Sequence, residues 1–181
     1  MKHFYEDITG YSCYAEQGIL LETILKLINT QNTIKIAEIG VYNGKLTAMW
    51  NVELINRQIS YEYYAIDHFK GSDGLTDVSY DVAISNLYPI KEHLKVINNN
   101  SIEESKNYLD NFFDIVYIDA SHDYESVKND LNHWYPKVKS GGIICGDDYS
   151  KYWKEVIVAV DEFFSQPINK IANMQWYVHK K

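Results

Sequence analysis

The stretch I-A-E-I-G-V-Y-N-G, residues 36–44, constrains the fold more than any other. A short apolar strand leads into a glycine turn, and the pattern of Leu46–Arg57 predicts a helix directly after it. A strand, a glycine turn and a helix in this order are typical of a nucleotide site in an α/β sheet. The stretch therefore predicts a ligand bound where the first strand ends.

Glu38 indicates which nucleotide ligand fits. The dinucleotide fingerprint is G-x-G-x-x-G, whose backbone N–H groups and helix N-terminus receive a pyrophosphate. Glu38 stands where its first glycine would be, ahead of Gly40 and Gly44. A carboxylate here would repel a phosphate but attract the ammonium and sulfonium groups of S-adenosylmethionine. Many unrelated turns satisfy E-x-G-x-x-x-G, so the assignment depends on the rest of the chain.

The chain has the size and composition of one globular domain. It contains 181 residues, of which 46% are hydrophobic, enough for a sizeable core. We predict a single domain over residues 1–181. Within it, residues 1–33 form an N-terminal helical cover and residues 34–181 form an α/β core.

Charge and hydropathy restrict the partners and the compartment. With 17 basic and 25 acidic residues, the net charge of −8 argues against nucleic acid or an anionic membrane as the main partner. No apolar run approaches the ~18 residues of a membrane span, and the N-terminus lacks the apolar segment of a signal peptide. We expect a cytoplasmic protein in which Cys13 and Cys145 are reduced packing residues.

Helical and strand patterns alternate along the chain, which predicts a doubly wound, mostly parallel α/β sheet. Ser101, with Glu104 three residues on, is the expected N-cap of the helix after the third strand. Strands are expected over 34–39, 63–67, 94–97, 113–119, 143–146 and 175–179, and helices over 17–29, 46–57, 124–134 and 153–164, with a further helix ending before Pro89.

Carboxylates follow several of these strands at the point where each one ends. They are Glu38, Asp67, Asp119, Asp147 and Asp148. Ligands bind at the carboxyl ends of parallel strands, so these side chains mark a site. Asp67 is placed like the acid that accepts hydrogen bonds from two ribose hydroxyls in nucleotide-binding folds. Taken singly, each acid could equally be a helix N-cap or a solvated loop residue.

Three of the acids form a second group, since Asp119, Asp147 and Asp148 end two strands that should be neighbours. Such carboxylates repel one another unless a cation lies between them. Oxygen ligands suit Mg²⁺ or Ca²⁺, or Mn²⁺, rather than Zn²⁺. The alternative is that Asp147 caps the next turn and Asp148 points into solvent. His122, three residues after Asp119, is a candidate general base.

Longer strings make the pattern more specific. They are D-I-V-Y-I-D-A-S-H-D-Y-E-S-V-K-N-D-L, K-S-G-G-I-I-C-G-D-D-Y and A-V-D-E-F-F. In this order they resemble the class I S-adenosylmethionine-dependent methyltransferases, and most closely the branch of macrocin-type sugar O-methyltransferases and cephalosporin hydroxylase-like proteins. The resemblance runs from about Glu16 to His179.

The resemblance implies a role for each candidate residue. Glu38, Gly40 and Gly44 would face the methionine moiety of the cofactor, Asp67 its ribose, and Asn100 and Ser101 its adenine. Asp119, Asp147 and Asp148 would bind a divalent metal, and His122 would act as the base. Asp119 would also take part in catalysis and in binding the cofactor. Some members carry a second acid just after the fourth-strand Asp, where this chain has Ala120 and Ser121.

The implied activity is metal-assisted O-methylation of a hydroxyl on a small molecule or carbohydrate. The acceptor and the oligomeric state cannot be predicted, and Met1–Tyr14 and Gly71–Asn86 are the candidate segments over the substrate. Two alternatives stay open: an NAD(P)-dependent oxidoreductase, which Glu38 disfavours, and a non-catalytic cofactor-binding protein of the same fold.

Overall fold

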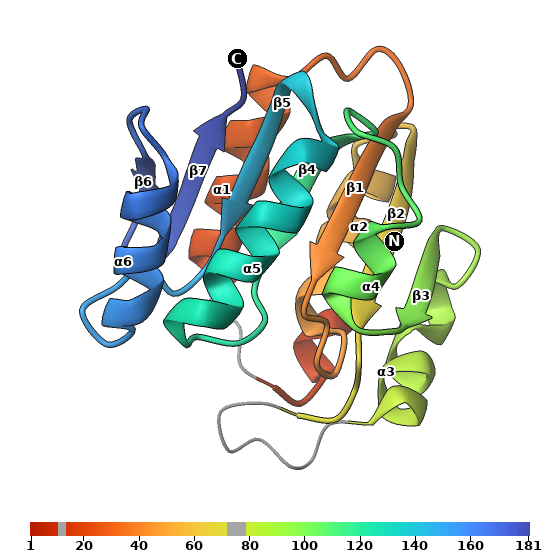
Figure 1. Ribbon diagram of the computed structural model, residues 1–181. Coiled ribbons are helices and arrows are strands. Elements are labelled where there is room, and N and C mark those ends of the chain that lie inside the picture. The colour runs from red at the N-terminus through yellow and green to blue at the C-terminus, as the bar shows by residue number, and fades with distance from the viewer. Residues whose placement is uncertain (11–13, 72–78) are drawn as a thin grey trace.

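A seven-stranded sheet lies at the centre of the computed structural model, which describes residues 1–10, 14–71 and 79–181 (Figure 1). The strand order is β3-β2-β1-β4-β5-β7-β6, with β7 antiparallel to its neighbours β5 and β6. The strands are β1 (Ile34–Ile39), β2 (Tyr61–Asp67), β3 (Leu94–Asn98), β4 (Phe113–Ile118), β5 (Val138–Gly146), β6 (Asn169–Ile171) and β7 (Gln175–His179).

Helices cover both faces of this sheet. In Figure 1, α4, α5 and α6 lie in front of the sheet, and α1 and α2 lie behind it. The helices are α1 (Tyr14–Leu27), α2 (Lys45–Asn56), α3 (Tyr80–Leu87), α4 (Ser101–Ser105), α5 (Tyr124–Trp134) and α6 (Lys154–Phe163). Short 3-10 turns are η1 (Phe4–Asp7), η2 (Tyr88–Ile90) and η3 (Tyr135–Lys137).

The strand register aligns the carboxyl ends of the central strands. Ile39, the last residue of β1, pairs with Ile66 of β2 on one side and with Ile118 of β4 on the other. Ile118 in turn pairs with Gly146 of β5. The residues that follow these strands therefore emerge next to one another along one edge.

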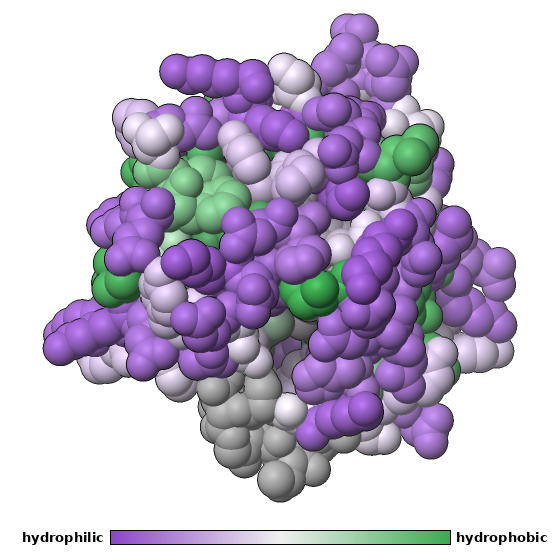
Figure 2. All heavy atoms as spheres, viewed as in Figure 1, coloured by the Kyte–Doolittle hydropathy of each residue, from purple (hydrophilic) through white to green (hydrophobic). Residues whose placement is uncertain are grey.

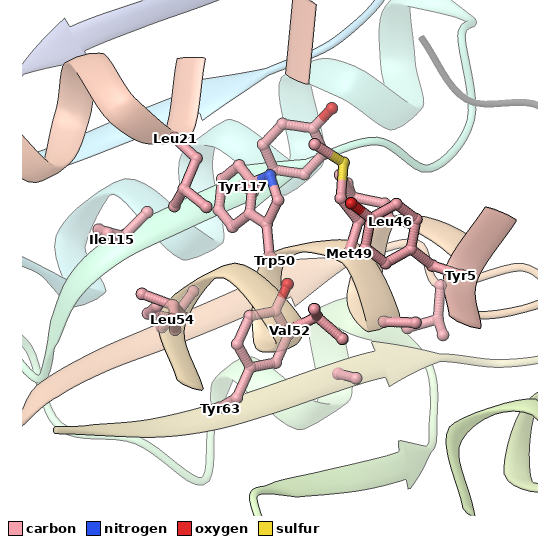
Figure 3. Close-up of a cluster of buried hydrophobic side chains, with 14 of the residues drawn as sticks. Tyr5, Leu21, Leu46, Met49, Trp50, Val52, Leu54, Tyr63, Ile115 and Tyr117 are labelled. Atoms are coloured by element: carbon pink, nitrogen blue, oxygen red, sulfur yellow. The ribbon is translucent and has the colours of Figure 1, made fainter. Parts of the chain in front are cut away.

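The core is divided by the sheet into two layers of apolar side chains. The layer behind the sheet includes Trp50 and Tyr117, whose rings meet edge to face with 5.1 Å between centroids (Figure 3). The layer in front includes Leu131 and Trp134 of α5. Both faces of the central strands are thus buried, as their nearly continuous apolar sequences predict.

Figure 2 shows a mostly hydrophilic surface on this side of the molecule, with small separate hydrophobic patches. Within the described residues, no helix has both the length and the apolar character that a membrane crossing needs.

The predicted fold class, a doubly wound and mostly parallel α/β sheet, is confirmed. The sequence pattern missed β6, because its three residues are short of any periodicity and largely exposed. It also placed the N-cap of α4 one residue too late. Asn100 is the N-cap, since its side chain accepts hydrogen bonds from the backbone N–H groups of Ile102 and Glu103. Cys13 lies outside the described residues, and Cys145 is a buried free thiol.

Candidate functional site

A cavity of about 870 Å³ opens at the carboxyl ends of β1, β2, β4 and β5. This volume suits a cofactor-sized ligand with a neighbouring acceptor. Almost all of the site residues predicted from the sequence line it; Gly44, set back at the start of α2, is the exception. The predicted lining residues are Glu38, Gly40, Asp67, Asn100, Ser101, Asp119, His122, Asp147 and Asp148.

Glu38 is buried in the cavity wall at the end of β1, with 1% of its surface exposed. Its Oε2 accepts hydrogen bonds from the hydroxyls of Thr47 (2.7 Å) and Tyr63 (2.8 Å). Its Oε1 has no hydrogen-bond partner among the described residues. The pKa of Glu38 is raised to about 8, mainly by burial and in smaller part by the nearby Asp67, against the lowering effect of the two hydroxyls. A cationic ligand would stabilise the charged form.

The glycine turn brings the backbone after β1 against the loop after β4. Gly40 has φ +93°, and a Cβ there would lie 1.9 Å from the carbonyl oxygen of Asp119. Gly44 has φ +82°, and its Cβ would meet the side chain of Leu87 at 2.9 Å. A side chain at either position would overlap these neighbours, so only glycine allows the turn to pack this closely against the loop after β4 and against Leu87.

Asp67 organises this turn from the end of β2. Its Oδ2 accepts hydrogen bonds from the backbone N–H groups of Val41 (2.8 Å) and Tyr42 (2.9 Å), and its Oδ1 accepts one from Phe69 (2.7 Å). A carboxylate has about four acceptor positions, so these three bonds leave little capacity for ribose hydroxyls. The ribose contact of Asp67 stays a prediction.

The segment after β3 contacts α5 in the wall of the cavity. The Asn100 side chain caps α4, as described above, and the Ser101 hydroxyl donates a hydrogen bond to Asp130 Oδ1 at 2.5 Å. Asp130 is only 4% exposed and lines the cavity together with Ser126 and Asn129 of the same helix. Burial raises the pKa of Asp130 to about 6.

A candidate metal or catalytic centre lies at the ends of β4 and β5. One ligand atom from each of Asp119, His122 and Asp148 falls within 4.8 Å of the others. His122 Nε2 lies 2.7 Å from Asp148 Oδ2, and the His122 ring stacks on Trp153 with 4.1 Å between centroids. The imidazole is therefore held by a carboxylate on one side and an indole on the other.

Asp147 is turned away from that group of three. Its Oδ1 accepts a hydrogen bond from the backbone N–H of Asp148 (2.7 Å), while Oδ2 accepts hydrogen bonds from Gln17 Nε2 (3.3 Å) and the Tyr117 hydroxyl (3.5 Å). Gln17 comes from α1, so the N-terminal helix contributes to the cavity wall. The role of Asp147 as a metal ligand stays a prediction.

The edge of the sheet is strongly acidic. Burial raises the pKa of Asp119 well above its ordinary value, and Asp147, Asp148 and Glu38 raise it further. Burial likewise raises the pKa of Asp147, with Asp148 as the next cause. The oxygens of these carboxylates are donors of the kind that fit a divalent cation such as Mg²⁺. The unpartnered oxygen of Glu38, in the cavity wall next to Gly40, fits the ammonium end of S-adenosylmethionine.

Sequence reasoning missed three residues of this site. Asp130 lies three residues after Val127, within the apolar stripe of α5, and Gln17 lies three residues before Leu20 on the buried face of α1. A polar residue inside an apolar stripe was the available signal in both cases. The third, Trp153, gave no signal beyond its place at the start of a helix.

The fold and site together define a class I S-adenosylmethionine-dependent methyltransferase architecture, as the sequence predicted; the narrower branch stays a prediction. Residues 37–149, more than half of the chain, match the family model described as a methyltransferase domain, and the chain belongs to this family. The uncharacterized protein R132 of Acanthamoeba polyphaga mimivirus is 30% identical over 141 residues, which are 75% of this chain. This match spans 62% of that protein's length.

Solved structures share the fold at low sequence identity. The O-methyltransferase NovP has a TM-score of 0.68 and 19% identity, covering 89% of this chain and 79% of its own. The calicheamicin methyltransferase CalS11 has a TM-score of 0.67 and 13% identity, and the match covers 89% of this chain and 77% of CalS11. The S-adenosylhomocysteine-bound methyltransferase PaMTH1 of Podospora anserina has a TM-score of 0.67 and 14% identity, and the match covers 99% of this chain and 86% of PaMTH1. These likenesses establish the architecture alone.

Proposed function

We propose that the protein transfers a methyl group from S-adenosylmethionine to a hydroxyl of a small molecule or carbohydrate. The observation that carries this proposal is the convergence of acidic side chains on one cavity edge, directly beside the glycine turn. A cationic methyl donor and a hydroxyl that must lose its proton both suit such an edge. A pyrophosphate does not, which disfavours a nicotinamide cofactor.

The residues of the first two strand ends would hold the methyl donor. Glu38 would accept the ammonium at its unpartnered oxygen, Gly40 allows the turn to pack against the loop after β4, and Asp67 fixes the shape of the turn through its three backbone contacts. When bound, S-adenosylmethionine supplies an electrophilic methyl on a sulfonium. The O–C bond forms as the C–S bond breaks, and S-adenosylhomocysteine leaves.

His122 is the proposed general base for the acceptor hydroxyl. Asp148, at 2.7 Å, orients the imidazole and stabilises the imidazolium that forms when the hydroxyl proton arrives. The stacked Trp153 restricts the ring to the plane in which this hydrogen bond is made. Both contacts hold the base in position before the acceptor binds, which lowers the entropic cost of reaching the reactive geometry.

A divalent cation, Mg²⁺ or another such as Mn²⁺ or Ca²⁺, is part of the proposal. Asp119, Asp147 and Asp148 would hold it, and it would lower the pKa of a bound hydroxyl. The charge of these three acids supports this assignment, since repulsion among them adds to the effect of burial in raising the pKa values of Asp119 and Asp147. For the acceptor class, CalS11 is named a TDP-rhamnose 3'-O-methyltransferase, which supports a sugar hydroxyl.

The test combines binding with turnover. Calorimetry should detect S-adenosylhomocysteine but not NAD, and a panel of hydroxylated acceptors with Mg²⁺ should yield a methylated product by mass spectrometry. His122→Asn should lose most turnover while keeping cofactor affinity, whereas His133→Asn, at a half-buried histidine on α5, should retain both. A protein that binds the cofactor but methylates nothing in the panel would overturn the enzymatic assignment.

The metal is tested separately by titrating the apoprotein with Mn²⁺. Binding should be lost in Asp119→Asn and Asp148→Asn, and Asp147→Asn shows whether the side chain now turned to Gln17 also serves as a ligand. Turnover that survives chelation unchanged would remove the metal from the proposal and leave the His122 base in place.

A further inference from the structure

Asp130 is a buried acid of the cavity that the proposed chemistry does not use. It lies on α5, away from the cluster at the ends of β4 and β5, and faces the loop after β3 through Ser101. Among the described residues, the Ser101 hydroxyl is its one hydrogen-bond donor. A carboxylate has about four acceptor positions, so Asp130 keeps acceptor capacity on the cavity side. This capacity lets Asp130 accept a hydrogen bond from a ligand in the cavity.

The neighbouring polar groups cannot take the same role. The side-chain oxygen of Asn100 accepts two backbone N–H groups as the cap of α4. The Ser101 hydroxyl gives its single proton to Asp130. The two residues expected from family resemblance to face the adenine are therefore engaged with the protein itself. Asp130 differs from Ser126 and Asn129, the other residues of α5 that line the cavity, in that it is an acid and can accept a hydrogen bond with a charged oxygen.

We infer that Asp130 accepts a hydrogen bond from the exocyclic amino group of the adenine and selects a 6-aminopurine over a 6-oxopurine cofactor. This rests on the proposed use of S-adenosylmethionine. The amino group of adenine is a donor, whereas the oxygen of hypoxanthine is an acceptor and would face a carboxylate unpaired. Such a mismatch in a buried site is strongly rejected, because both groups lose their hydrogen bonds to water.

The test compares S-adenosylhomocysteine with S-inosylhomocysteine by calorimetry. The wild-type protein should prefer the adenosyl compound by about tenfold or more, which corresponds to the loss of one buried hydrogen bond. Asp130→Asn offers both a donor and an acceptor, so its preference should fall to within about threefold. Asp110→Asn, an exposed acid paired with Lys137 outside the cavity, serves as the matched control and should keep the wild-type preference.

Ser101→Ala separates the two members of the pair, because it removes the hydroxyl but keeps the carboxylate. It should retain the preference for the adenosyl compound. Equal affinity of the wild-type protein for both compounds, or loss of the preference in Ser101→Ala alone, would overturn the assignment of Asp130. Failure of the wild-type protein to bind either compound would instead refute the proposed use of the cofactor.

Discussion

Replacing Glu38 with glutamine should stabilise the protein and weaken its cofactor binding at the same time. Glutamine has the shape of the protonated glutamic acid, and its side-chain oxygen can still accept the hydroxyls of Thr47 and Tyr63. It cannot carry the charge that burial disfavours. The wild-type protein and Glu38→Gln should therefore differ in stability only at pH values at which the carboxyl group of Glu38 ionises.

The magnitude follows from the pKa of Glu38, which burial raises from 4.5 in an unfolded chain to about 8 in the fold. Below pH 4.5 both states are protonated and the two proteins should be equally stable. As the pH rises, the unfolded wild-type chain releases its proton while the folded one keeps it, so wild-type stability falls by ~1.4 kcal/mol per pH unit. Above pH 8 the glutamine variant should be more stable by about 5 kcal/mol at most.

Urea unfolding of both proteins between pH 5 and 9 measures this difference, and the other buried acids are common to both and cancel. Glu62→Gln is a matched control on β2, since Glu62 also accepts a tyrosine hydroxyl, from Tyr64, but is only half-buried. It should show no comparable gain. A Glu38→Gln protein that is no more stable than the wild type at pH 8 would refute the argument from burial.

Cofactor binding should change in the opposite direction. The ammonium of S-adenosylmethionine stabilises the ionised form of Glu38, so wild-type binding at pH 7 should release up to one proton. Glu38→Gln should release none of that proton and bind about tenfold more weakly or worse, as expected for the loss of a charge-assisted hydrogen bond. Calorimetry in two buffers of different ionisation enthalpy gives both quantities. Equal affinity in the two proteins would place the ammonium elsewhere.

Three further changes test the frame of the site. Gly40→Ala should destabilise the fold by about 3 kcal/mol or more in urea unfolding, because its Cβ would overlap the carbonyl oxygen of Asp119; a fully stable variant would contradict the turn geometry. Cys145, whose pKa burial raises, should react with a thiol reagent only in the unfolded protein. Glu16→Ala should cost about 1–3 kcal/mol through its lost bonds to the β6–β7 turn, while Glu22→Ala, exposed on the same helix, should cost less than about 1.

The helices and strands whose apolar residues follow a regular pattern could be predicted from the sequence. The buried apolar run of β4 and the stripe of α5 have a clear period, and the predicted range 124–134 matches that helix. β6 could not be predicted, because three largely exposed residues pair with β7 only once the sheet exists. The N-cap at Asn100 was missed because Ser101 and Glu104 fit a capping box equally well.

The sequence predicts which strand ends form the site, but it does not predict which side chains of the site contact one another. Acids at the carboxyl ends of β1, β2, β4 and β5 must gather at one edge, so their proximity follows from the fold class. Which of them face each other depends on side-chain rotation. Asp147 and Asp148 are adjacent in the sequence, yet Asp148 reaches His122 while Asp147 reaches Gln17. Asp148 has φ +61°, and this turn of the backbone, which no pattern in the sequence indicates, separates the two.

Helix α1 and the β6–β7 turn, which are far apart in the sequence, meet beside the catalytic candidates, and this arrangement suggests where acceptor selectivity lies. Glu16 of α1 accepts hydrogen bonds from the β6–β7 turn, which places Gln17 and Met174 in the cavity wall. Trp153 adds an indole that is 38% exposed. Gln17, Trp153 and Met174 lie outside the stretch 37–149 that matches the methyltransferase family, whereas the proposed cofactor residues lie inside it. We therefore expect substitutions at these three positions to change the Michaelis constant for the acceptor while leaving S-adenosylhomocysteine affinity within about twofold, since only ligand contacts remote from the cofactor are altered.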